Sequence, residues 1–320
     1  MSSPHSTSEP YDHGLLATGD GNLIYYELRG NPNGLPLVIV HGGPGTGSPT
    51  GTPRSFDPDR YHVILFDQRG CGRSVPTASD PATSMATNTT VHLLGDMERL
   101  REHLRVDRWL IFGGSWGSGL AVDYAERHPA RVAGLVVVSV WTMSRPEIAW
   151  LYGGGVGQLF PDEYEQFEAA VPADLRTGDV VSDYVRLMGD QDESVRMSAA
   201  SSWAAWEDTV VSLEPQGRSR PFSDRPAKEL QAFVRICSTY AANAAWREDG
   251  ALARDAHLLA DVPGSIVHGR LDLSCPLRTA RDLARAWPRA SFVVADDAGH
   301  KGGPSMNLAL REAFEQLDRP

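Results

Sequence analysis

Short apolar runs rich in β-branched residues recur along the chain and alternate with longer stretches of helical periodicity. Seven runs have the length and composition of strands: Leu23–Leu28, Leu37–Val40, His62–Phe66, Trp109–Phe112, Ala133–Val140, Ser265–His268 and Phe292–Ala295. Several are apolar throughout, as in strands that are buried on both faces of a parallel sheet. Helical patterns such as Leu93–Arg105 and Gly117–Arg127 lie between them. The alternation predicts an α/β fold with a mostly parallel central sheet and crossover helices.

The strand pattern stops after Val140 and resumes at Ser265. Between Trp141 and about Ala245 the chain has helical and aromatic character and no strand-like run. We interpret this segment as an inserted helical cap, with residues 1–140 and 246–320 forming the core and residues 141–245 forming the cap. Such an insertion would cover the carboxyl edge of the sheet, where ligands bind in open α/β folds.

Composition and charge narrow the possible partners. The 320 residues are 41% hydrophobic and 22% charged, and the formal net charge is −11. An acidic surface repels phosphate backbones and anionic lipids, so we expect neither nucleic-acid nor membrane partners. Residues 1–14 lack the apolar centre of a secretion signal, and no apolar run approaches the ~20 residues of a membrane span. We therefore expect a cytoplasmic protein.

The cysteine and histidine positions do not suggest a metal site. Cys71, Cys237 and Cys275 are too few and too scattered for a disulfide framework or a zinc site, and the ten histidines have no metal-ligand spacing. We expect neither a metal nor a cofactor, while the oligomeric state stays open.

A Gly-x-Ser-x-Gly motif at Gly113–Gly117 lies between a predicted strand and a predicted helix. Flanking glycines allow a strand to turn sharply into a helix, which leaves the hydroxyl of Ser115 exposed at the bend. The alternative is an ordinary glycine-rich turn. The strand before the motif and the helix after it favour a nucleophilic serine.

A serine hydroxyl needs a base to remove its proton and an acid to orient that base. Asp272 follows the strand Ser265–His268, and His300 follows the strand Phe292–Ala295. Both would emerge at the same sheet edge as Ser115, in the chain order serine, acid, histidine. The alternatives are a solvated turn aspartate and a surface histidine. Asp296 and Asp297 are rival acids, but they lie too close to His300 in the chain, and we expect a structural role for His268.

Two further glycine-containing segments follow predicted strands. His41–Gly45 follows Leu37–Val40 and has the composition of an oxyanion loop, for which we predict the N–H groups of Gly43 and Trp116 as donors. A phosphate-binding loop is the alternative, but the spacing of its motifs is absent. Asp67–Ser74 contains Cys71 between glycines, and we predict a charge-braced turn there rather than a nucleophile.

Together these motifs resemble the prolyl aminopeptidase (proline iminopeptidase) family of serine hydrolases. The segments that carry the resemblance span about residues 20–300: His41–Gly45, Asp67–Ser74, Asn88–Thr90, Asp96–Leu100, Gly113–Ser118, Phe160–Asp162, Trp206–Glu207, His268–Asp272, Cys275–Pro276 and Asp297–His300. The resemblance implies an α/β-hydrolase fold, a catalytic triad of Ser115, Asp272 and His300, no cofactor, and removal of N-terminal proline from peptides.

The resemblance weakens at the positions that select the substrate. Family members hold the free amino group of the substrate with acidic cap residues, and Glu207 matches one of them. The second belongs to a stretch that usually reads Ala-Arg-Ile-Glu-Asn-His-Tyr-Phe, in which Cys237 here replaces the glutamate and Ala241 replaces an aromatic residue. The family's Leu-Arg-Gly-Ile-Phe reads Val-Val-Ser-Val-Trp, ending at Trp141, and lacks the arginine.

We expect an apolar acyl pocket under the cap, lined by Trp141, Trp150, Tyr152 and Trp206. Glu207 would bind a substrate amine, unless it is a solvated glutamate on the cap surface. The sequence thus favours an aminopeptidase with an altered amine site, acting on a short peptide or other small molecule. The alternatives are an esterase, amidase or acyl-transfer enzyme acting on a specialised metabolite, and a non-catalytic binding protein on the same scaffold.

Overall fold

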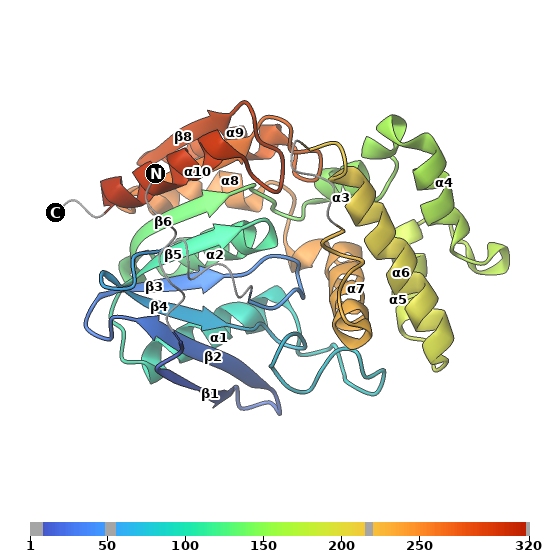
Figure 1. Cartoon of the computed structure of the whole chain (residues 1–320), viewed down its shortest axis with the longest axis horizontal. Coiled ribbons are helices and arrows are strands. Elements are labelled where there is room, and N and C mark those ends of the chain that lie inside the picture. The colour runs from blue at the N-terminus through green and yellow to red at the C-terminus, as the bar shows by residue number, and fades with distance from the viewer. Residues whose placement is uncertain (1–8, 49–55, 215–219, 318–320) are drawn as a thin grey trace.

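The computed structural model describes residues 9–48, 56–214 and 220–317, and its centre is one sheet in the strand order β1-β2-β4-β3-β5-β6-β7-β8 (Figure 1). The strands are β1 (Asp12–Ala17), β2 (Leu23–Gly30), β3 (Leu35–Val40), β4 (Tyr61–Phe66), β5 (Trp109–Gly114), β6 (Val132–Val138), β7 (Gly264–Gly269) and β8 (Ala290–Ala295). The pairings from β4 to β8 are parallel, and those of β1 with β2 and of β2 with β4 are antiparallel. The predicted mostly parallel sheet is confirmed.

The sheet edge differs from the prediction at the N-terminus. Strand β1 was not predicted, because its side chains are mostly exposed and its sequence lacks the β-branched character of the inner strands. It forms by pairing with β2, which places Gly14 opposite Tyr26. Of the segment examined for a secretion signal, residues 1–8 lie outside the described residues.

Helices cover both faces of the sheet. The helices of this layer contact the strands or each other. They are α1 (Thr90–His103), α2 (Trp116–Arg127), α8 (Ala251–Asp255), α9 (Leu277–Ala286) and α10 (Pro304–Leu317). Along β3, Val38 and Val40 pack in the core on the side of α1 and α2, while Leu37 and Ile39 pack toward Phe314 of α10. Successive residues of a strand point to opposite faces, so a strand that is covered on both sides is apolar throughout.

A second, helical layer lies beyond the carboxyl ends of the strands, toward which the arrowheads of β3, β5 and β6 point in Figure 1. Its helices are α3 (Arg145–Leu151), α4 (Pro161–Ala169), α5 (Val180–Met188), α6 (Glu193–Val210) and α7 (Ala227–Ala242). Short 3₁₀ turns complete the described connections: η2 (Pro129–Arg131), η3 (Val156–Leu159), η4 (Ala173–Leu175), η5 (Ala244–Trp246) and η6 (Ala256–Leu259).

Aromatic side chains form the interior of this helical layer. The ring of Phe167 stacks on Tyr184 with centroids 4.8 Å apart and on Trp206 at 5.7 Å. Trp203 and Trp206 are both essentially inaccessible to solvent. The aromatic character of the segment therefore comes in large part from the helical layer's own core. In the part of the chain that is described, no helix has both the length and the apolar character needed to cross a membrane.

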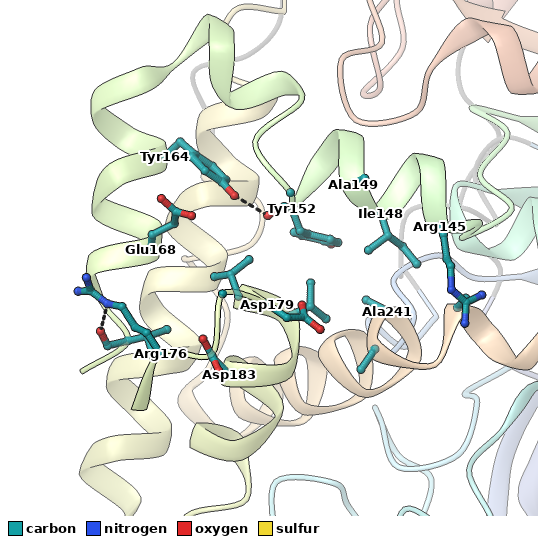
Figure 2. A pocket seen from close by; sticks show the side chains of 17 residues that line it. Arg145, Ile148, Ala149, Tyr152, Tyr164, Glu168, Arg176, Asp179, Asp183 and Ala241 are labelled. Atoms are coloured by element: carbon teal, nitrogen blue, oxygen red, sulfur yellow. Dashed lines mark hydrogen bonds between the residues drawn. The ribbon is translucent and has the colours of Figure 1, made fainter. Parts of the chain in front are cut away.

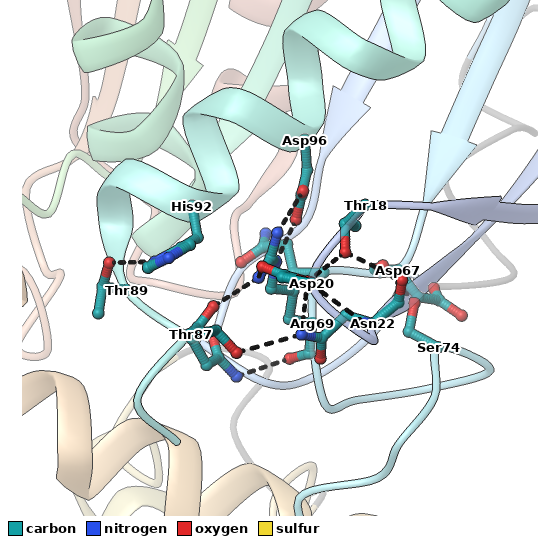
Figure 3. A network of polar contacts seen from close by, with 12 residues as sticks. Thr18, Asp20, Asn22, Asp67, Arg69, Ser74, Thr87, Thr89, His92 and Asp96 are labelled. Carbon is teal, nitrogen blue, oxygen red and sulfur yellow. Dashed lines mark hydrogen bonds and ion pairs between the residues drawn. The ribbon is translucent and has the colours of Figure 1, made fainter. Parts of the chain in front are cut away.

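The turn after β4 is braced by charges, as predicted (Figure 3). The guanidinium of Arg69 makes two hydrogen bonds to Asp96, at 2.6 and 2.7 Å, and reaches Asp20 at 2.6 Å. The Asp67 carboxylate accepts from the N–H of Ser48 at 2.7 Å. Burial raises the pKa of the Cys71 thiol far above its ordinary value, so this cysteine is a neutral core residue.

Candidate active site

Ser115 lies at the sharp bend between β5 and α2, with φ 54° and ψ −129°. This conformation is strained for a residue with a side chain, and it turns the serine out of the sheet. The bend requires glycine beside it, because a Cβ on Gly117 would lie 2.1 Å from the carbonyl oxygen of Val40 and one on Gly113 would lie 2.4 Å from the carbonyl oxygen of Gly117. The motif therefore forms the strand–turn–helix that the sequence predicted.

The loops after β7 and β8 bring Asp272 and His300 together. Nδ1 of His300 lies 3.0 Å from one carboxylate oxygen of Asp272 and 3.2 Å from the other. The N–H of Cys275 donates to the same carboxylate at 2.8 Å. Ser115 and His300 line one cavity. The three residues thus meet at one sheet edge because parallel strands end there together.

Charge around His300 favours its protonated form. Burial disfavours an imidazolium, but the carboxylates of Asp272, Glu214 and Glu207 outweigh burial and raise the pKa of His300 to about 9. The His300 charge and the Cys275 N–H in turn lower the pKa of Asp272 against its own desolvation. An imidazolium formed by proton transfer is therefore well stabilised at this place.

The rival residues have other partners. Nδ1 of His268 accepts the N–H of Val140 at 3.1 Å, and its other ring nitrogen lies 2.9 Å from the carbonyl oxygen of Cys275, so His268 links main-chain segments. Asp296 pairs with Arg270, and Asp297 hydrogen-bonds Ser305. These contacts agree with the structural role predicted for His268.

The oxyanion loop and the bend at Ser115 are tied together by Gln68, which the sequence analysis did not single out. The side-chain amide of Gln68 donates to the carbonyl oxygen of His41 at 2.9 Å, and its oxygen accepts the indole N–H of Trp116 at 2.9 Å. Trp116 is the first residue of α2, so its backbone N–H has no partner within the helix. Gly43 lines the cavity beside Ser115. The Gln68 side chain thereby fixes the two predicted donor segments relative to each other.

The cavity at Ser115 is small, about 180 Å³. Its lining residues are Gly42, Gly43, Thr46, Ser115, Trp141, Leu151, Glu207, Phe222, Ser274, Cys275 and His300. Glu207 is the only acidic residue among these described lining residues. Pockets for drug-sized ligands measure ~300–1,000 Å³. This cavity therefore has room for a small acyl group close to the serine.

The carboxyl group of Glu207 is fixed by hydrogen bonds from residues of the helical layer. One of its carboxylate oxygens accepts the hydroxyl of Tyr152 at 2.6 Å and the indole N–H of Trp203 at 3.1 Å. The thiol of Cys237 lies 3.5 Å from the same hydroxyl. Glu207 is 8% exposed, and desolvation raises its pKa although the two hydrogen bonds and the charge of His300 oppose the shift. Glu207 is thus a fixed, buried carboxyl group rather than a solvated glutamate.

The other predicted pocket residues lie further back. Of the four aromatic residues expected to line the acyl pocket, Trp141 lines the cavity. Tyr152 and Cys237 support Glu207 instead. The indole of Trp150 donates to the carbonyl oxygen of Leu273 at 2.8 Å, and that of Trp206 donates to Leu151 at 2.9 Å. Neither tryptophan is among the residues that line the cavity, and each indole N–H is engaged with main chain.

Relatives of known name cover almost the whole chain. The model of the alpha/beta hydrolase fold family matches residues 36–303. A probable proline iminopeptidase of Streptomyces coelicolor is 43% identical over 97% of this chain and 96% of its own length. A proline iminopeptidase of Xylella fastidiosa is 42% identical over 93% of this chain and 94% of its own. This chain belongs to the proline iminopeptidase family. The resemblance predicted from the motifs is confirmed, and the protein is a serine-type α/β-hydrolase enzyme.

Solved structures support the fold of this family member. A proline iminopeptidase-related protein from Thermus thermophilus superposes with a TM-score of 0.63 at 22% identity, covering 96% of this chain and 98% of that one. An esterase from Rhodococcus superposes with a TM-score of 0.56 at 19% identity, covering 95% and 96%. At such identities the likeness shows the α/β-hydrolase fold and nothing about substrate.

One group of side chains in this protein has the spacing of metal ligands. It consists of Asp272, Cys275 and His300, whose possible ligand atoms lie within 4.8 Å of one another. A cysteine binds a metal as its thiolate. Burial raises the pKa of the Cys275 thiol well above its ordinary value, which disfavours the thiolate, and Nδ1 of His300 is hydrogen-bonded to Asp272. The hydrogen-bonded acid–histidine pair accounts for this cluster.

A larger cavity of about 550 Å³ lies among the helices of the second layer (Figure 2). Tyr152 and Ala241 line it, and Tyr164 donates its hydroxyl to the carbonyl oxygen of Tyr152 at 2.8 Å. Neither Ser115 nor His300 lines this cavity. Size alone would therefore select a cavity that contains neither Ser115 nor His300, whereas the chemistry of the lining favours the smaller cavity.

Proposed function

We propose that this enzyme removes a small N-terminal residue, proline foremost, from short peptides or related amides. Ser115 attacks the carbonyl carbon, and His300 takes the hydroxyl proton and passes it to the leaving amine. Asp272 holds the imidazole through Nδ1, and the N–H groups of Gly43 and Trp116 receive the oxyanion. Water then attacks the carbonyl carbon of the acyl-enzyme while His300 takes a proton from the water. His300 returns this proton to the oxygen of Ser115, and the free amino acid is released.

The observation that carries the proposal is Glu207 in the cavity of Ser115. A buried carboxyl group fixed by two donors lines the same cavity as Ser115, and we assign it to the α-ammonium of the substrate. Desolvation raises the pKa of Glu207, and a cation bound beside it would lower that pKa again, which supports the same assignment. An aminopeptidase needs such a group to select a free N-terminus.

The size of the site supports a single small residue. A cavity of about 180 Å³ with Trp141 and Leu151 in its wall offers a compact apolar surface for a ring or short side chain. We propose that helices of residues 141–245 form the cap that closes this space and excludes water. We further propose that the enzyme works in the cytoplasm on small substrates, since its three cysteines are free and its net charge of −11 disfavours nucleic acid.

One observation favours a second candidate, hydrolysis or transfer of an ester or amide that has no free amine. By the motif resemblance, Cys237 replaces a second glutamate of the family. Burial together with Glu207 raises the pKa of its thiol well above the ordinary value. A neutral thiol leaves one carboxyl group to hold the ammonium. Losing one partner of a buried charged contact costs about 2–5 kcal/mol, which is enough to shift a substrate preference.

A hydrolysis panel tests the two candidates. It compares prolyl, alanyl and other aminoacyl arylamides with their N-blocked counterparts and with short p-nitrophenyl esters, and Ser115→Ala serves as the inactive control. Faster cleavage of the free prolyl arylamide than of its blocked form supports the aminopeptidase. Cleavage of esters and blocked amides alone would reject it in favour of the second candidate. Absence of both cleavage and fluorophosphonate labelling of Ser115 would reject catalysis altogether.

A further inference from the structure

A second glutamate of the helical layer reaches the loop that carries His300. Glu214 follows the end of α6 and is 6% exposed. One of its carboxylate oxygens accepts the backbone N–H of His300 at 2.7 Å, and the other accepts the backbone N–H of Lys301 at 2.8 Å. Both oxygens of a buried carboxylate are thus used on two consecutive main-chain groups, one of them at the candidate general base.

The loop is shaped to receive this carboxylate. A Cβ on Gly299 would lie 2.4 Å from Cδ of Glu214, 2.5 Å from its Cγ and 2.8 Å from its Oε1, and these are the three nearest atoms. Gly299 does not have a positive φ, so its backbone would accept alanine. The close approach of Glu214 is therefore the reason that residue 299 lacks a side chain.

The same stretch of chain carries the group proposed to bind the substrate amine. Glu207 lies in the last turn of α6, and its carbonyl oxygen accepts the N–H of Val211 at 3.4 Å. The carbonyl oxygen of Val211 then accepts the N–H of Glu214 at 3.4 Å. One short hydrogen-bonded segment thus connects the candidate amine site to the candidate base.

We propose that Glu214 is a positioning residue for His300, through which the helical layer fixes the base and stabilises its imidazolium. The proposal rests on the role of His300 given above. Proton transfer in both half-reactions requires the ring to keep one orientation, and an error of 1 Å costs about 100-fold in rate. Asp272 holds the ring through Nδ1, and Glu214 holds the backbone from the opposite layer.

Several groups act on the charge of His300 together with Glu214. Asp272 and Glu207 favour the imidazolium, whereas desolvation disfavours it. Burial and the charge of His300 lower the pKa of the neighbouring His268. Cys275, which lies within the same cluster, is neutral. Replacing Glu214 by glutamine removes one negative charge from this set and keeps a hydrogen-bond acceptor.

The rate of Ser115 labelling by a fluorophosphonate probe tests the proposal without any assumption about the substrate. We expect Glu214→Ala to slow labelling by about 100-fold. Compared above the acidic limb, where His300 is neutral in both enzymes, Glu214→Gln should slow labelling by about tenfold, because one charge-assisted hydrogen bond is lost. Glu165→Gln, at an exposed position of α4, is the matched control and should label at the rate of the unmodified enzyme.

The pH profile of labelling separates positioning from mere stabilisation. If the Glu214 charge acts on His300, Glu214→Gln should move the midpoint of the acidic limb down by about one unit. Loss of stability alone would lower the melting temperature and leave that midpoint in place. A Glu214→Gln variant that labels at the unmodified rate with the unmodified midpoint would overturn the proposal.

Gly299→Ala provides an independent route to the same perturbation. Its new methyl group should displace Glu214 and slow labelling about as much as Glu214→Ala does. In the Glu214→Ala background the obstructing side chain is gone, so Gly299→Ala should change the rate by less than about twofold. Additive effects of the two changes would contradict the proposal. An enzyme that labels but cleaves no free-amine substrate would refute the aminopeptidase proposal while leaving these comparisons valid.

Discussion

Replacement of Glu207 by glutamine isolates the charge that we assign to substrate recognition. Glutamine has the shape of glutamate, and its oxygen can still accept from Tyr152 and Trp203, whose donors lie 2.6 and 3.1 Å from the present carboxylate oxygen. The change therefore removes the negative charge while the packing stays the same. Truncating one partner of a buried charged pair costs about 2–5 kcal/mol, or about 30- to 4,000-fold in kcat/KM.

The assay is the ratio of kcat/KM for free prolyl arylamide to that for its N-blocked form. We expect Glu207→Gln to lower this ratio by at least about 30-fold, with most of the loss on the free-amine substrate. Glu193→Gln, an exposed change at the start of the same helix, should leave the ratio unaltered. An unchanged ratio in a folded Glu207→Gln enzyme would refute the assignment of Glu207 to the amine.

Three other predictions follow from named contacts. Cys237→Glu should raise kcat/KM on free prolyl arylamide by about tenfold, since it adds a second carboxyl group near the first, and a folded variant without gain would contradict this. The pKa of His300 is raised to about 9 and its neutral form is the base, so turnover of blocked esters should fall as pH drops below about 9; a flat profile down to about pH 5 would contradict this role. A cationic substrate offsets the surrounding carboxylates, so its acidic limb should lie at lower pH. Arg69→Met leaves Asp96 unpaired in a site where both side chains are 3% exposed, so urea unfolding should show a loss of about 3–5 kcal/mol. Arg278→Met, at an 89%-exposed side chain, should change stability by less than about 0.5 kcal/mol, and equal losses for the two variants would refute the argument.

Local patterns predicted every described strand except β1, and they predicted the loops that carry the candidate triad. Runs such as Leu37–Val40 are apolar at every position, which only a strand buried on both faces requires. The glycines around Ser115 have no alternative residue, because any Cβ at Gly117 would meet the backbone of the neighbouring strand. The parallel topology then brings Asp272 and His300 to the same edge, since loops that follow parallel strands emerge together.

The helical layer was predicted less completely. An excess of aromatic residues indicated a pocket, yet Trp150 and Trp206 do not line the cavity of Ser115 and Tyr152 supports Glu207. A tryptophan in an α-helix has the same sequence signal whether it faces a ligand or another helix. Strand β1 was missed for the opposite reason, because its residues are half exposed and only pairing with β2 makes them a strand.

The sequence by itself determined which chemistry this protein carries. The order of strand, glycine-flanked serine, helix, acid and histidine is local information, and each motif follows its own strand. Only the tertiary structure showed how the acids of the helical layer lie relative to the candidate triad. Glu207 and Glu214 lie only seven residues apart, about two helical turns. Yet Glu207 lines the cavity of Ser115, and Glu214 accepts the backbone N–H of His300, 86 residues away. Such contacts depend on how the helical layer docks against the sheet edge, and docking is set by the packing of many side chains at once rather than by any local pattern.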